Sequence, residues 1–234
     1  MHIGILQCGQ APDALKDIGG DYPDMFRALL DGRGFTFSTY HVEGGEFPEG
    51  PDAADGWLIT GSRHGAYEDH DWIPPLENFI RTAFDQAVPM VGVCFGHQII
   101  AQALGGKVEK FDGGWAVGPT LYDFGDEEVT LNAWHQDQVV ALPEGAEIAG
   151  RNDFCEYAAL IYDDRAYSVQ AHPEFDNAFI EGLIEHRGGS IPDDLIADAR
   201  EKMHRDPDSA RFARKFEAFF KQPRPLKRKT EGAA

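Results

Sequence analysis

The sequence has few cysteines, and they are not arranged for disulfide bonds. Its 234 residues include three cysteines, Cys8, Cys94 and Cys155, an odd number without a pairing pattern. Free thiols of this kind are typical of proteins kept in a reducing compartment. Hydrophobic residues make up 42% of the chain. We therefore expect a cytoplasmic protein that is stabilised by a packed core rather than by cross-links.

Positive charge is also scarce. Asp and Glu number 40 against 21 Lys and Arg, which gives a formal net charge of −19. A field of this sign repels phosphate backbones, so we expect no nucleic-acid partner. The exception is the segment KQPRPLKRK at residues 221–229, which carries five positive charges. We interpret it as a solvated tail; a docking arm for an acidic partner is the alternative.

Long apolar runs are missing. The stretch MHIGILQCG at the start has no basic region followed by a long apolar run, so no signal peptide is predicted. Residues 86–106 contain no Asp, Glu, Lys or Arg, but Pro89, His97 and Gln98 interrupt them, and we expect no membrane span there. No internal repeat and no G-x-x-x-x-G-K-[ST] motif occurs, so no P-loop is predicted.

The first half of the chain alternates short apolar runs with helical patterns. We predict strands at residues 2–8, 35–42, 56–60 and 89–93, and helices at 22–30, 73–87 and 96–104. Strands separated by helices form βαβ units. The predicted fold is therefore α/β, with a mostly parallel central sheet that helices cover on both faces.

The second half has a different rhythm. Short runs separated by turn signals predict added strands, some antiparallel, at residues 106–111, 119–124, 128–134, 147–150, 155–162 and 166–170. A helix is predicted at 177–186, and helical patterns at 193–204 and 209–220 follow the break RGGSIPDD. We expect a main domain at residues 1–187, followed at 188–234 by a helical extension and the basic tail.

The segment VGVCFGHQII at residues 91–100 places Cys94 between a predicted strand and a predicted helix. The carboxyl end of a parallel strand faces the ligand crevice of an α/β sheet. The positive end of the helix favours a thiolate, and the amide of Phe95 is free to bind an oxyanion. Gly92 and Gly96 are the small neighbours that a strained strand-to-helix elbow requires. The alternative is a buried structural cysteine.

A second segment, QAHPEF at residues 170–175, supplies a base and its partner. In an extended chain His172 and Glu174 point to one face, and Pro173 favours an extended His172. The imidazole could then reach the thiol while the carboxylate holds its other ring nitrogen. An HPE sequence alone is more typical of a loop histidine, but together with the elbow it favours a Cys–His–Glu triad.

VGVCFGHQ together with AHPE resembles the class I glutamine amidotransferase family of the triad type, over roughly residues 2–186. The match places Cys94, His172 and Glu174 at the three catalytic positions. It implies a flavodoxin-like fold and a stand-alone, glutaminase-like member. It also implies attack on the γ-carbonyl of glutamine or of a γ-glutamyl compound, through a γ-glutamyl thioester and without a cofactor.

The resemblance also implies binding residues. LITGS at residues 58–62 matches the loop whose backbone amide completes the oxyanion hole with Phe95; many members have Gly-Gly-Pro, and this chain has Gly61, Ser62 and Arg63. We prefer Ser62 as the donor over Gly61. Further implied contacts to the substrate come from Gln98 and from WHQD at 134–137, namely Trp134, His135 and Asp137. A strand end with a packed tryptophan is the alternative for WHQD.

Residues 63–72, RHGAYEDHDW, collect imidazoles and carboxylates that could bind a metal. The ligand types are mixed and no H-E-x-x-H spacing occurs, so we expect a solvated loop beside the active-site mouth and neither a metal nor a cofactor. Only about fifty residues follow residue 186, too few for a synthetase domain.

Three functions remain open from the sequence. The first is a glutaminase that serves a partner synthetase or acceptor subunit. The second is a free-standing hydrolase of γ-glutamyl peptides or amides. The third is a non-catalytic binding or regulatory protein on the same scaffold.

Overall fold

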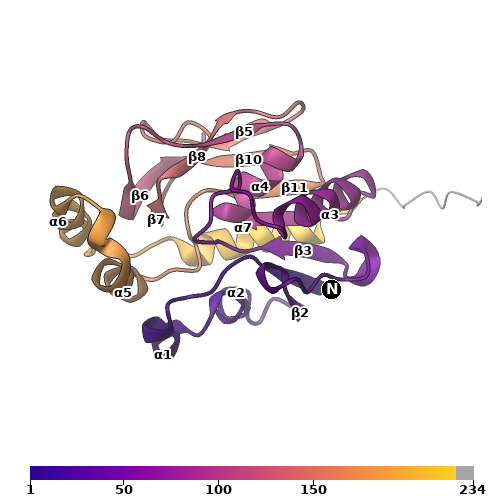
Figure 1. The fold of residues 1–234 in the computed structure, drawn as a ribbon, viewed down its shortest axis with the longest axis horizontal. Coiled ribbons are helices and arrows are strands. Elements are labelled where there is room, and N and C mark those ends of the chain that lie inside the picture. The colour runs from indigo at the N-terminus through magenta and orange to yellow at the C-terminus, as the bar shows by residue number, and fades with distance from the viewer. Residues whose placement is uncertain (225–234) are drawn as a thin grey trace, which may run out of the picture.

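The structure, a computed structural model that describes residues 1–224, is built on a seven-stranded sheet in the order β2-β1-β3-β4-β11-β10-β9 (Figure 1). The strands are β1 His2–Gln7, β2 Thr36–His41, β3 Gly56–Ile59, β4 Met90–Val93, β9 Glu147–Gly150, β10 Ala159–Tyr162 and β11 Ala166–Val169. The neighbours from β2 through to β11 pair in parallel. Strands β10 and β9 extend the sheet in antiparallel fashion.

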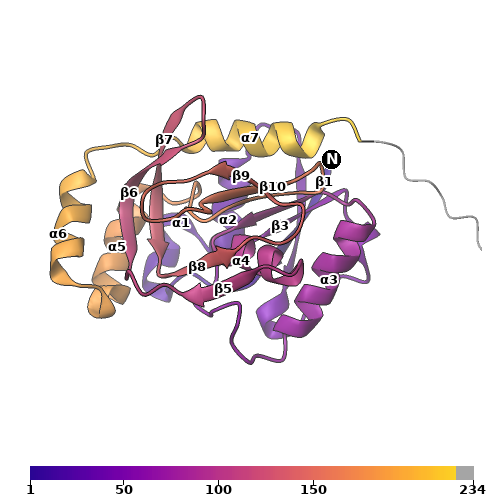
Figure 2. The same cartoon turned by 90° about the horizontal axis from the view of Figure 1, so that it is seen from above.

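Helices cover both faces of this sheet. The helices of the described residues are α1 Lys16–Gly19, α2 Tyr22–Leu29, α3 Ile73–Asp85, α4 Phe95–Ala103, α5 Asn177–Arg187, α6 Asp193–Lys202 and α7 Ser209–Lys221, and those on the two faces are α2, α3, α4 and α7. Helices α3 and α4 pack on Trp57 and Ile59 of β3. Helices α2 and α7 pack on the other face, against Ile3, Ile5 and Leu58. Alternate residues of a strand therefore pack into the two apolar cores on opposite faces of the sheet. Figure 2 shows α7 on the side of the sheet opposite α3 and α4.

Two antiparallel pairs lie outside the central sheet. Strand β5 Lys107–Lys110 pairs with β8 Asp137–Ala141, and β6 Ala116–Asp123 pairs with β7 Glu128–His135. The sequence did not predict β8, because only Gln136 separates it from β7 and no turn residue marks the boundary. Helices α5 and α6 share a third apolar cluster with Val117 of β6.

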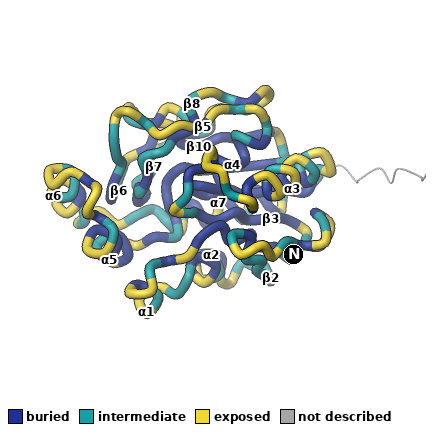
Figure 3. Tube along the Cα trace, viewed as in Figure 1, coloured by how far each residue is buried: buried dark blue, intermediate teal, exposed yellow. Residues whose placement is uncertain are grey.

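The predicted α/β fold with extra antiparallel strands and C-terminal helices is confirmed. Figure 3 shows the central strands buried and the exposed residues gathered on the outer sides of helices such as α3 and α6. Helix α7 buries Phe212, Phe216, Phe219 and Phe220 in the core. The division at residues 187/188 stays a prediction, and residues 225–229 of the predicted basic tail lie outside the described residues. Within residues 1–224, none of the helices is long and apolar enough to cross a bilayer.

Candidate active site

Three neighbouring parallel strands end at one edge of the sheet, and each is followed by a predicted site residue. Ser62 follows β3, Cys94 follows β4 and His172 follows β11. All three line one cavity of about 320 Å³. A methyl group added to Gly61 would lie 3.2 Å from Cε1 of His172 and 3.8 Å from Cβ of Cys94, so the three segments converge at that point.

Cys94 lies on a strained elbow between β4 and α4. Its φ is 54° and its ψ is −105°, a conformation that costs a non-glycine residue about 1–3 kcal/mol. The turn is possible because the residues two positions before and after Cys94 are glycines. A Cβ at Gly92 would lie 2.4 Å from the carbonyl oxygen of Gly96, and one at Gly96 would lie 2.2 Å from that of Ile59. The elbow therefore holds the thiol at the start of the helix, on the cavity wall.

His172 is buried and tightly held. Its Nδ1 donates to Oε1 of Glu174 at 2.7 Å, and its ring stacks on Phe175 with centroids 4.0 Å apart. Its backbone amide donates to the carbonyl oxygen of Asn132 at 2.8 Å. Burial lowers the pKa of His172, but Glu174 and Cys94 together outweigh it, so the net pKa is well above its usual value. The direction of this shift favours the protonated form of the imidazole.

The other two cysteines have a different environment. Burial raises the pKa of Cys155 to about 12, and burial followed by the charge of Glu43 raises the pKa of Cys8 well above its usual value. Neither lines the cavity of Cys94. Both are therefore inert core thiols at neutral pH.

Two backbone amides beside the thiol are available to an oxyanion. Phe95 is the first residue of α4, where an amide has no acceptor within the helix. Ser62 follows Gly61, which lies close to Cys94, and Oγ of Ser62 accepts from the amide of His64 at 3.1 Å. Within residues 1–224, neither the Phe95 nor the Ser62 amide donates to a protein acceptor. The amides of Phe95 and Ser62 are therefore both available as donors. The preference for Ser62 over Gly61 stays a prediction.

The predicted substrate contacts all line the same cavity: Gln98, Trp134, His135 and Asp137. The side-chain amide of Gln98 donates to the carbonyl oxygen of Asp137 at 2.8 Å and to Oε1 of Gln170 at 3.1 Å, so it also ties α4 to the start of β8. Burial and the nearby charge of His172 lower the pKa of His135 to about 3, which keeps this ring neutral. Burial raises the pKa of Asp137.

Sequence reasoning missed several residues of the cavity wall: Tyr22, Tyr67, Lys110, Trp115, Phe175 and Arg187. Trp115 packs beside Trp134, with ring centroids 6.1 Å apart. Burial is the main cause that raises the pKa of Tyr22, and the guanidinium of Arg187 partly opposes it. These residues come from separate segments without a shared motif, so no pattern in the sequence marks them.

The loop at residues 63–72 forms part of the cavity mouth, where His64 and Glu68 line the wall. One ligand atom from each of His64, Glu68 and His70 lies within 4.8 Å of the others. Asp69 and Asp71 of the same loop are exposed and outside this group. Of the five imidazole and carboxylate side chains in this loop, the structure thus brings three close together.

The chain is similar to known proteins over most of its length. The family model described as glutamine amidotransferase class-I matches residues 53–178. Gamma-glutamyl peptidase 4 of Arabidopsis thaliana is 32% identical over 86% of this chain and 87% of that protein. A GMP synthase [glutamine-hydrolyzing] of Vibrio vulnificus is 37% identical over 51% of this chain but 24% of its own length. A crystal structure of glutamine amido transferase from Methylobacillus flagellatus has a TM-score of 0.74, with 22% identity and 93% coverage of each chain. The chain belongs to the class I glutamine amidotransferase family.

Proposed function

We propose that this protein hydrolyses the γ-glutamyl amide bond of small peptides and amides, with Cys94 as nucleophile. The observation that carries the proposal is the strained elbow of Cys94 facing the same cavity as His172, whose other nitrogen bonds Glu174 at 2.7 Å. A buried histidine with a raised pKa beside a cysteine is the arrangement of a thiolate–imidazolium pair.

The chemistry follows from this pair. The Cys94 thiolate attacks the γ-carbonyl carbon, and the negative charge that develops on the oxygen is stabilised by the amides of Phe95 and Ser62. His172 gives its proton to the leaving amine as the C–N bond breaks, which leaves a γ-glutamyl thioester. Neutral His172 then takes a proton from water, the hydroxide attacks the thioester carbonyl, the C–S bond breaks to return the Cys94 thiolate, and free glutamate leaves with its new γ-carboxylate. Glu174 is a positioning residue that keeps the imidazole oriented.

Two observations favour a γ-glutamyl peptide over free glutamine. The similarity to gamma-glutamyl peptidase 4 spans most of both chains, whereas the GMP synthase match covers 24% of that relative. The cavity wall also carries the basic side chains of Lys110 and Arg187 in a chain of net charge −19. Such cations can bind the carboxylate at the far end of a γ-glutamyl peptide.

The second candidate is the amide hydrolysis of glutamine itself, in the service of a partner synthetase. The family membership supports it, because the GMP synthase relative is named as glutamine-hydrolysing. The third, a binding protein without chemistry, predicts an unreactive thiol at Cys94.

The test compares purified protein on γ-glutamyl dipeptides, γ-glutamyl amines and glutamine, with the released amine or ammonia measured directly. We expect the highest kcat/KM on the dipeptides. The Cys94→Ala variant should lose turnover and keep the fold, while Cys155→Ala, the matched control at a buried thiol outside the cavity, should keep activity. Glutamine as the best substrate, with a rate that depends on a second protein, would favour the second candidate. Turnover by Cys94→Ala would remove the mechanism.

A further inference from the structure

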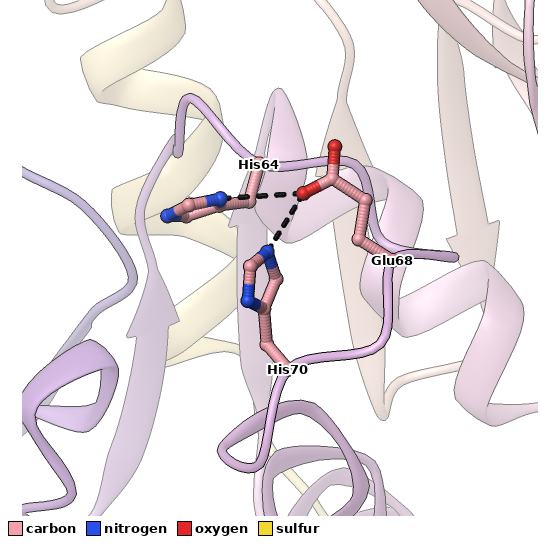
Figure 4. Close-up of side chains that lie close together, drawn as sticks. All are labelled: His64, Glu68 and His70. Atoms are coloured by element: carbon pink, nitrogen blue, oxygen red, sulfur yellow. Dashed lines mark hydrogen bonds and ion pairs between the residues drawn. The ribbon is translucent and has the colours of Figure 1, made fainter.

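The loop between β3 and α3 brings two imidazoles and one carboxylate to a single point (Figure 4). Oε2 of Glu68 lies 3.3 Å from Nδ1 of His64 and 2.7 Å from Nε2 of His70. The two rings pack edge to face, with centroids 4.2 Å apart. Figure 4 shows both rings directed toward the same carboxylate oxygen.

The site is held by surrounding contacts. Nε2 of His64 lies 3.2 Å from Oε1 of Glu43, a side chain that is 18% exposed. Nε of Arg63 lies 3.4 Å from the same nitrogen and donates to it only when that nitrogen is unprotonated. When the nitrogen instead carries the proton and donates it to Glu43, the lone pair of Nδ1 of His64 faces Glu68. This carboxylate–histidine arrangement is the outer support that metal-binding histidines usually have. His70 in turn stacks on Trp72 at 6.2 Å.

The donor set and its spacing suit one class of cation. Two imidazole nitrogens and one carboxylate oxygen form the three-ligand set of open zinc sites. Zinc bonds of about 2.0–2.1 Å at tetrahedral angles place ligand atoms about 3.3 Å apart. The His64–Glu68 separation of 3.3 Å already has this value. The His70–Glu68 separation must widen, and the Glu68 side chain, 42% exposed, is free to move outward.

We propose that His64, Glu68 and His70 bind one divalent transition-metal ion of the zinc type, with a further coordination position left to water or to a group in the adjoining cavity. This site is separate from the proposed hydrolysis, because no step of that reaction uses these three side chains. It departs from the solvated loop that the sequence favoured.

The site is coupled to the thiol through two contacts. The amide of His64 donates to Oγ of Ser62 at 3.1 Å. Trp72, against which His70 packs, lies 5.4 Å from the ring of Phe95, the residue after Cys94. A bound ion would therefore fix the loop next to Ser62, one proposed oxyanion donor, and would hold Trp72 against the ring of Phe95, whose backbone amide is the other proposed donor.

The test measures metal binding to the full chain carrying Cys94→Ala, in which the thiol cannot itself ligate the ion. Zn²⁺ binding is followed by titration calorimetry, and Co²⁺ binding by its visible absorption, which reports the coordination geometry. We expect one ion per chain and a tetrahedral Co²⁺ spectrum. Because supporting carboxylates are worth about 10–100-fold in metal affinity, Glu43→Gln should weaken binding by roughly 10-fold. Loss of a direct ligand in His70→Ala or Glu68→Gln should weaken binding by more than loss of the supporting carboxylate does, that is, by more than roughly 10-fold.

The matched control is Asp71→Asn, which removes the same charge as Glu68→Gln from the same loop but lies outside the cluster. It should leave the affinity unchanged. Thermal unfolding of each variant without metal checks that the chain remains folded. The proposal is overturned if neither ion binds, if His70→Ala and Glu68→Gln both bind as tightly as their parent, or if Asp71→Asn weakens binding as much as Glu68→Gln.

Discussion

Replacing Glu174 by Gln tests whether the buried carboxylate acts through His172. The Glu174 side chain is 1% exposed and its Oε1 accepts from His172 at 2.7 Å, while its Oε2 has no partner among the described residues. Gln has nearly the same shape, so the substitution removes the charge and leaves the packing. The amide of Gln can take either of two orientations. The losses in kcat/KM expected for these two orientations set the lower and upper limits of the predicted loss.

With its oxygen toward His172, Gln keeps the hydrogen bond but not the charge. Hydrogen bonds to charged groups are worth about 1.5–3 kcal/mol, which is roughly a 10- to 150-fold loss in kcat/KM. With its nitrogen toward His172, the proton moves to the ring nitrogen that must serve the thiol. The corresponding substitution in serine protease triads costs about 10⁴-fold. We therefore expect a loss between these limits.

The pH profile separates this role from a structural one. Glu174 raises the pKa of His172, so its neutralisation lowers that pKa. His172 must be protonated to act on the leaving amine, and the protonated fraction is lost as pH rises through its pKa. The alkaline limb of kcat/KM should therefore move to lower pH in Glu174→Gln. Wild-type kcat/KM with an unmoved alkaline limb would refute the reasoning; Glu185→Gln, at an exposed carboxylate on α5, is the control.

Three further predictions concern stability. Gly96→Ala should lower the free energy of unfolding by about 1–3 kcal/mol and reduce turnover, because its Cβ would lie 2.2 Å from the Ile59 carbonyl oxygen. An unchanged free energy of unfolding in urea would contradict this close contact. Phe216→Ala should cost about 3–5 kcal/mol in the same assay, because this α7 side chain is fully buried against the sheet, and a loss under about 1 kcal/mol would mean that α7 docks weakly. Burial, followed by the charge of His135, lowers the pKa of His97 to about 3. The contribution of neutral His97 to the free energy of unfolding should therefore be complete above the unfolded pKa of about 6.5. It should fall by roughly 1 kcal/mol per pH unit as the pH decreases from there toward 3. His97→Gln should have a shallower acid slope, and an equal slope in both proteins would exclude His97 as its source.

Much of the scaffold was readable because its signals are local. The apolar runs before Gly61 and Cys94 became β3 and β4, and the glycines at 92 and 96 predicted the elbow. Strand β8 was missed because a single residue, Gln136, separates it from β7. Strand β8 pairs with β5, which is distant in the sequence. A pairing of this kind cannot be predicted from the residues that are adjacent to β8 in the chain.

The sequence alone determined the strained elbow at Cys94, because sterics between neighbouring residues set its conformation. The extended path predicted through Glu174 is wrong: Pro173 and Glu174 form a turn, closed by the amide of Phe175 donating to the carbonyl oxygen of His172 at 3.4 Å, and this turn brings the carboxylate to Nδ1 of His172. Only the tertiary structure decided that the two segments face one cavity, since that depends on β4 and β11 being adjacent in the sheet. The same holds for the cavity wall and for the grouping of His64, Glu68 and His70. The order of the strands results from the packing of the whole core, so it cannot be predicted from any single stretch of residues.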